Sequence, residues 1–181
     1  MDTKEYILSH IRSVRVKLEV IIEEFKKRLF RHDQSKLESP EYELWCKMDE
    51  EPRYSYGTPE YFDKIQRYKK VFDLHYKHNS HHPEHYENRI LDMDLVDVLE
   101  MLIDWISYKN NIRITEAIDL IDQQSERYNL SEELTCILKN TLINYFCVFA
   151  DDKESYVLSE HHILYGSPDK PNIPHTVDIN A

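Results

Sequence analysis

The chain has 181 residues, 41% of them hydrophobic, which is enough for one domain with a buried core. Its formal net charge of −11 disfavours direct binding of nucleic-acid polymers, whose phosphates attract basic surfaces. A mean hydropathy of −0.66 and the lack of a long apolar run argue against a transmembrane helix or a signal peptide. The three cysteines lack metal-type spacing and indicate reduced thiols, so we expect a cytoplasmic protein without a membrane partner.

The first helix is predicted over residues 3–31, where apolar side chains recur at spacings of three and four. A short second helix should end before Pro40, and the prolines and Gly57 within residues 40–60 predict an irregular excursion. Four further helices are predicted over residues 59–78, 91–108, 115–128 and 131–149. Thr115 and Ser131 are suitable N-caps for the last two.

These elements predict an all-α fold: a single-domain bundle of about five to seven helices over residues 1–165. No glycine or proline falls between Pro83 and Gly166, which favours helices over a sheet with tight turns. Residues 166–181 contain three prolines and no periodicity, so we expect a mobile C-terminal tail there.

Histidines concentrate in one short stretch, which holds five of the ten within eleven residues: His75, His78, His81, His82 and His85. Imidazole and carboxylate are ligands that borderline divalent metals prefer, although histidine-rich surface loops also occur without metal. Pro83 interrupts any helix, so the five rings cannot all face one way. We favour His75, His81 and His82 as ligands, and assign His78 and His85 to substrate contacts.

A His32-Asp33 pair precedes this stretch, and Lys36 follows it by about one helical turn. Adjacent histidine and aspartate side chains can bind one metal, and a nearby ammonium can neutralise a substrate phosphate. The alternative is a capped turn, in which Asp33 accepts hydrogen bonds from backbone N–H groups. The sequence alone leaves both interpretations open.

The segment over residues 91–108 places acidic side chains on one face of an otherwise apolar helix. A carboxylate on a central helix must be paired or bound to metal, because burying it alone is costly. Asp104 is our preferred ligand on this face, and Asp97 is second. Near the histidines, Glu84 is a candidate base or orienting residue, and Tyr86 is a candidate for stacking on a nucleotide base.

Together these motifs resemble the HD superfamily of helical metal-dependent phosphohydrolases. Its members have a leading histidine, a His-Asp pair often continued as His-Asp-x-Gly-Lys, and a later helical aspartate. The matching residues here are His10, His32-Asp33 with Lys36, and Asp104 or Asp97.

The chain is also similar to a family of small phage and bacterial proteins, over roughly residues 5–145. The shared motifs are His-Ile-x-x-Val, His-Asp-x-Ser-Lys-Leu, Asn-x-His-His-Pro-Glu-His and Glu-Met-Leu-x-Asp-Trp, which here begin at His10, His32, Asn79 and Glu100.

His10 departs from the superfamily pattern, because no turn is predicted between it and His32. In a continuous helix their 22-residue separation, at about 1.5 Å per residue, corresponds to roughly 33 Å. Either the helix breaks near Val20 or His10 acts elsewhere, for example across the interface of a homodimer.

The resemblance implies a metal-dependent phosphohydrolase that acts on a nucleotide or related small phosphoester and serves as a phage accessory protein. Its cofactor would be a divalent ion of Mn, Fe, Ni, Zn or Mg. The ligands would be drawn from His10, His32, Asp33, His75, His81, His82 and Asp104, with Lys36 neutralising phosphate. Two other classes stay open: a non-enzymatic protein that binds a ligand or metal, and an acidic protein that inhibits a basic partner.

Overall fold

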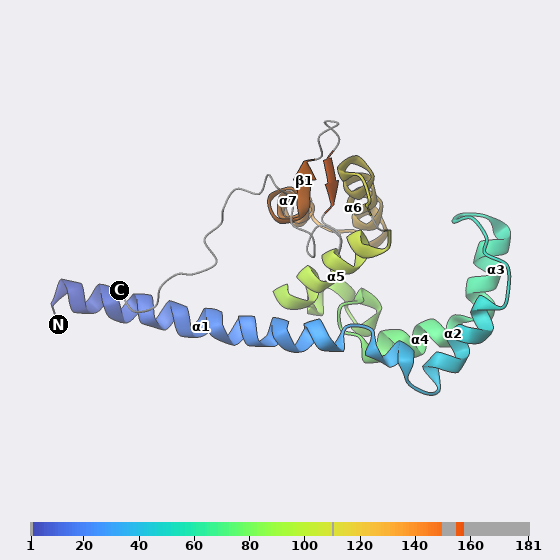
Figure 1. Cartoon of the computed structure of the whole chain (residues 1–181), viewed down its shortest axis with the longest axis horizontal. Helices are drawn as coiled ribbons and strands as arrows, with labels where there is room; N and C mark the ends of the chain where they lie inside the picture. Colours follow the sequence, from blue (N-terminus) through green and yellow to red (C-terminus); the bar gives the residue numbers. More distant parts are fainter. Residues whose placement is uncertain (1, 110, 150–154, 158–181) are drawn as a thin grey trace. The chain divides into compact units, whose positions relative to one another are not determined.

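The computed structural model describes residues 2–109, 111–149 and 155–157 (Figure 1). The all-α prediction is confirmed, because seven α-helices dominate the described residues, together with one short hairpin that we did not predict. The chain divides into two compact units with a boundary between Met101 and Leu102, and each is described by itself. None of the described helices has the length and apolar character needed to cross a membrane.

The helices of the first unit are α1 (Thr3–Arg31), α2 (Glu41–Asp49), α3 (Pro59–Arg67), α4 (Lys69–His78) and the start of α5 (Leu95–Ser107). Short 3-10 helices connect them: η1 (Gln34–Leu37), η2 (Pro83–His85) and η3 (Arg89–Asp92).

Helix α1 has the predicted bounds and is continuous over 29 residues, and none of its residues is buried. In Figure 1 its N-terminal part extends away from α2, α3 and α4. The helix ends where the His32 N–H donates to the Arg28 carbonyl (2.8 Å) and Asp33 adopts a left-handed conformation, with φ 56°. That conformation stops the helical hydrogen-bond ladder and starts η1.

Two sequence predictions in the first unit are wrong. Residues 41–49 form α2 rather than an irregular excursion, because Pro40 occupies the position before the first helical turn, where a proline costs no hydrogen bond. The helix predicted over residues 59–78 is two helices, since Tyr68 ends α3 and precedes α4 with ψ at 16°.

The interior of the first unit is unusually polar. Its buried apolar side chains are Val71, Pro83, Val96, Val98 and Met101. Its buried polar side chains are Glu41, Lys64, His75, Asn79, His81 and Asp97. Buried polar groups must find partners to offset their lost hydration, so this interior contains a connected polar network rather than a conventional apolar core.

The second unit contains the rest of α5, α6 (Ile114–Tyr128), α7 (Glu132–Thr141), a π-helical turn η4 (Leu142–Phe146) and strands β1 (Cys147–Phe149) and β2 (Ser155–Val157). The strands are antiparallel, with Cys147 opposite Val157. Its apolar core consists of Leu102, Ile106, Ile112, Ala117, Ile121, Leu138, Leu142 and Val157.

The predicted N-caps of the second unit had different outcomes. Ser131 caps α7, since its hydroxyl oxygen accepts the Leu134 N–H at 3.2 Å. Thr115 is not the cap of α6; that position belongs to Arg113, whose backbone N–H donates to Glu116 (3.1 Å). The helix predicted over residues 131–149 gives way at Cys147 to β1. The tail predicted over residues 166–181 lies outside the described residues.

Candidate metal centre

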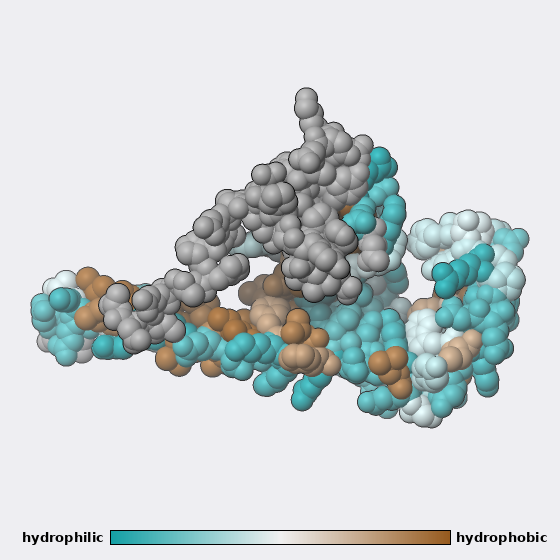
Figure 2. All heavy atoms as spheres, viewed as in Figure 1, coloured by the Kyte–Doolittle hydropathy of each residue, from teal (hydrophilic) through white to brown (hydrophobic). Residues whose placement is uncertain are grey.

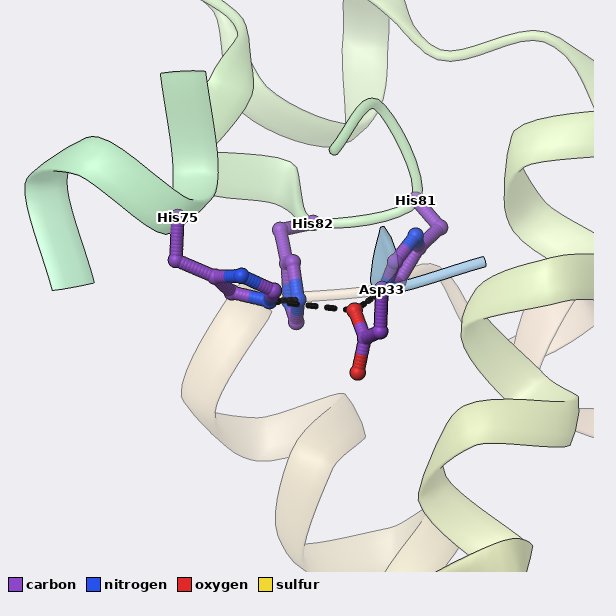
Figure 3. Close-up of side chains that lie close together, drawn as sticks. All are labelled: Asp33, His75, His81 and His82. Carbon is purple, nitrogen blue, oxygen red and sulfur yellow. Dashed lines mark hydrogen bonds and ion pairs between the residues drawn. The ribbon is translucent and has the colours of Figure 1, made fainter. Parts of the chain in front are cut away.

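Four side chains of the first unit converge on one point and form the histidine–aspartate cluster: Asp33, His75, His81 and His82 (Figure 3). Their ligand atoms all lie within 4.8 Å of one another. The Asp33 Oδ1 atom is 3.3 Å from His75 Nε2 and 3.6 Å from His81 Nε2. The Nε2 atoms of His75 and His82 are 2.9 Å apart. One carboxylate and three imidazoles at these separations could hold a metal ion.

The backbone explains why these four meet. Asp33 turns inward because its left-handed conformation ends α1, and His75 lies in the last turn of α4. Asn79 holds these pieces together, donating from its side-chain amide to Ser35 Oγ and to the His75 carbonyl, each at 2.8 Å. His81 and His82 follow in the loop before η2, which Pro83 starts.

Carboxylates outside the cluster orient two of its rings. Glu41 Oε1 accepts from His75 Nδ1 at 2.8 Å and from Trp45 Nε1 at 3.0 Å. Glu100 Oε1 lies 3.3 Å from His81 Nδ1. These carboxylates favour the tautomer with the hydrogen on Nδ1, and in that tautomer the Nε2 atoms of His75 and His81 present lone pairs to the cluster.

The cluster therefore contains buried acceptors that face each other. Asp33 Oδ1 and His81 Nε2 are both buried and have no hydrogen-bond partner among the described residues. They lie 3.6 Å apart, and in the Nδ1-protonated tautomer of His81 neither atom carries a hydrogen for the other. Buried acceptors without a donor lose their hydration without compensation, and a cation between them would remove that cost.

Glu100 also joins a second group of potential ligands, with His32 and His81. His32 Nδ1 lies 3.0 Å from Glu100 Oε1, and Arg28 Nη1 donates to Glu100 Oε2 at 2.9 Å. The same Arg28 nitrogen donates to the buried Asp97 at 2.6 Å. Helix α5 thus anchors the end of α1 and the histidine loop through two carboxylates.

The cluster favours ionised carboxylates. Burial raises the pKa of Asp33, but the contacts with His75 and Lys36 lower it by more, so its pKa lies well below the usual range. Burial likewise raises the pKa of Glu100, and its contacts with His32, His81 and Arg28 outweigh this effect. Both groups are therefore charged at neutral pH, which is the state that binds a cation.

A polar pocket of about 200 Å³ lies beside the cluster within the first unit. It is lined by Glu24, Arg28, Arg31, His32, His78, Asn79, Ser80, His81 and Glu100. Arg28 is committed to Asp97 and Glu100, whereas the exposed Arg31 makes no ion pair within the part of the chain that the structure describes. Arg31 thus supplies the available positive charge at this pocket.

The other predicted functional residues lie around the cluster. Lys36 Nζ donates to Asp33 Oδ2 at 2.5 Å and lies 5.5 Å from the centre of the Trp45 ring. His78 is exposed and lines the pocket, with Nδ1 3.9 Å from Glu41 Oε2. Glu84 lies in η2 and belongs to none of the potential ligand groups among the described residues.

His85 and Tyr86 have structural partners. His85 Nδ1 donates to the Tyr76 carbonyl at 2.7 Å. The Tyr86 hydroxyl donates to Asp97 Oδ2 at 2.6 Å, and burial together with this bond raises the pKa of Tyr86 to about 12. The predicted substrate contacts of these two residues stay predictions.

His10 requires a correction. Helix α1 does not break near Val20, so about 33 Å separates His10 from His32 along a continuous helix. Within one chain, His10 cannot join the histidine–aspartate cluster. Asp104 lies on α5 one helical turn beyond Glu100, in the second unit, and its side chain is half-buried.

The residues of this site that were not among the predicted ones include Glu41, Glu100 and Arg31. Glu41 falls in the segment predicted to be irregular, although its i,i+4 spacing from Trp45 after Pro40 is a usable signal for a helical pair. Glu100 lies on the predicted acidic face of α5, where Asp104 was preferred. Nothing in the sequence distinguishes Arg31 from the other basic residues of α1.

The fold and the cluster define a mainly helical protein with a histidine–aspartate site that could hold a metal ion. The chain belongs to a family described as a family of unknown function (DUF5662), whose model matches residues 1–144. This match includes every residue of the cluster and of the pocket. No curated protein and no solved structure matches the chain.

Proposed function

We propose that this protein is an HD-type metal-dependent phosphohydrolase that acts on a nucleotide or related small phosphoester. The observation behind the proposal is the pair of buried, unpartnered atoms in the cluster, Asp33 Oδ1 and His81 Nε2. A solvent-exposed cluster of histidines would have no such need for a cation.

The donor set fits a borderline divalent ion. Three imidazole nitrogens and one carboxylate oxygen favour Mn, Fe, Ni or Zn over Mg, which prefers oxygen ligands and bound water. The 2.9 Å between the Nε2 atoms of His75 and His82 is close to the roughly 3 Å that separates neighbouring ligands in a six-coordinate site with metal–nitrogen bonds of about 2.1 Å. A bound ion would supply Lewis acidity and lower the pKa of a water molecule.

The pocket supports a phosphate-containing substrate. Its volume of about 200 Å³ suits a phosphoryl group better than a whole nucleotide, since pockets for drug-sized ligands measure roughly 300–1,000 Å³. Arg31 can form a bidentate contact with phosphate oxygens, and His78 and Ser80 add polar atoms to the lining. His81 lies in both the cluster and the pocket, so a phosphoryl group in the pocket would lie beside the metal ligands.

Metal content tests the first part of this proposal. We expect protein purified without chelators to contain Mn, Fe, Ni or Zn by mass spectrometry, and His81→Ala to lose it. The control is Asp73→Asn, which removes an exposed potential ligand outside the cluster and should retain the metal. Equal metal content in the two variants, or no metal and no binding of added metal in the wild type, would refute the site.

Turnover tests the second part. We would screen nucleoside mono-, tri- and cyclic phosphates for metal-dependent phosphate release. Arg31→Ala should raise KM at least ten-fold, while Arg12→Ala, an exposed arginine elsewhere on α1, should leave KM unchanged. A protein that binds metal but hydrolyses none of these substrates would be a metal-binding protein without this activity.

A further inference from the structure

The apolar face of α1 has no partner within the first unit. Six side chains form this α1 seam: Ile7, Ile11, Val14, Leu18, Ile21 and Phe25. None of them is buried, and Leu18 is 56% exposed. Figure 2 shows hydrophobic surface recurring along α1. A contiguous exposed apolar patch of this kind indicates an interaction site.

The spacing of the α1 seam is that of a coiled coil. Its residues alternate at intervals of four and three, which gives a repeat of 3.5 residues per turn and keeps the seam facing a partner helix. Leu8, Ile22 and Leu29 widen the seam along one flank, and all three are exposed. The pattern fits a second helix of similar length and apolar character.

The charges of α1 make the helix complementary to itself in one orientation. Lys17 and Glu24 lie on one flank of the α1 seam, because each directly precedes a seam residue. In a parallel pair both would face apolar residues of the partner subunit. Two antiparallel copies place Lys17 of each helix beside Glu24 of the other, and charges flanking a seam set partner orientation in this way.

We propose that two copies of this chain form a homodimer through an antiparallel pair of α1 helices. The inference is independent of the metal site. A 29-residue helix is about 43 Å long, and covering a third of its circumference buries roughly 600 Å² per subunit, or about 1,200 Å² in total, at the lower end of specific interfaces. The contact is isologous, so it closes as a dimer.

Solution mass tests the dimer. Light scattering or sedimentation should give twice the chain mass of 21.9 kDa. Leu18→Asp places a charge in the seam and should weaken dimerisation at least 100-fold. The matched control is Val16→Asp, which alters a residue that is similarly exposed (59%) but lies on the opposite side of α1 and should stay dimeric.

A charge-reversal experiment tests the orientation. Lys17 and Glu24 are seven residues apart and so lie on the same flank of the seam, where antiparallel helices bring them together. In a parallel pair they would instead face Ile22 and Leu29 of the partner subunit. Lys17→Glu should therefore weaken the dimer about ten-fold, and adding Glu24→Lys should restore it. Circular dichroism would confirm that each variant stays helical.

Three outcomes would overturn the proposal. The first is a wild-type chain that is monomeric at tens of micromolar. A monomer that cosediments with vesicles containing anionic phosphatidylserine would overturn the proposal in the same way. The second is a dimer that Leu18→Asp and Val16→Asp weaken equally. The third is a dimer in which Lys17→Glu has no effect, since this would exclude the antiparallel arrangement.

Discussion

Replacing Asp33 by asparagine should separate metal binding from structural support. The wild-type carboxylate faces His81 Nε2 with no hydrogen bond between them, whereas an asparagine amide can donate to that nitrogen. The substitution also removes the ion pair with Lys36. Because the Lys36 side chain is 38% exposed, this ion pair stabilises the folded state by about 1 kcal/mol at most. The new hydrogen bond from the asparagine amide to His81 Nε2 should stabilise the folded state by about the same amount. We therefore expect the metal-free Asp33→Asn protein to match the wild type within about 1 kcal/mol.

Added metal should make the wild type more stable than Asp33→Asn. A ligand at 100 times its Kd stabilises the folded state by about 2.7 kcal/mol, which for a chain of this length raises the Tm by roughly 5–11 °C. The wild type should show this shift when Mn, Ni or Zn is added to chelator-treated protein. Asp33→Asn should show little or none, because it lacks the anionic ligand.

Differential scanning calorimetry with and without each metal measures both quantities. The control is Asp73→Asn, which removes an exposed aspartate from an ion pair with Lys69 and should keep the full metal-induced shift. If Asp33→Asn lowered the metal-free Tm by 10 °C or kept the metal-induced shift, the side chain would have a purely structural role and our reasoning would be wrong.

The other predictions concern the residues around the cluster. Glu41→Gln should weaken metal binding about ten-fold by calorimetric titration, because His75 keeps its position but loses a charged acceptor at Nδ1. Tyr86→Phe should lower the free energy of unfolding in urea by about 1–3 kcal/mol, since it removes a donor from the buried Asp97. The pKa of Glu100 is lowered in the folded state, so its stabilisation is present above the unfolded value near 4.5 and is lost as the pH falls below it. Glu100→Gln should accordingly flatten the loss of metal-free stability between about pH 5 and 3, and an unchanged slope would contradict the assigned shift.

Local patterns were sufficient to predict several elements. Helix α1 has the predicted bounds because no glycine or proline interrupts its apolar periodicity. Ser131 caps α7 because a serine before two glutamates fits a first helical turn. The break at Tyr68 has no such local signal, since the residues on either side favour helix.

The partners of the predicted histidines required tertiary information. His75 and Glu41 are 34 residues apart, and His32 and Glu100 are 68 apart. Sequence spacing can identify residue types that bind metal, but it cannot show which carboxylate meets which ring. The left-handed backbone of Asp33 was equally hidden, although it directs that side chain into the cluster.

The site differs from a histidine-rich loop because its parts come from separate elements. Of the five clustered histidines, three supply ligand atoms to the cluster, while His78 is exposed and His85 bonds to a backbone carbonyl. What distinguishes His75 and His81 is a buried or half-buried carboxylate behind each ring, on α2 and α5 respectively. These carboxylates favour the proton on Nδ1, and that tautomer leaves Nε2 open toward Asp33. A metal-ready state therefore depends on α2 and α5 as much as on the histidines, whose density in the sequence indicated neither Glu41 nor Glu100.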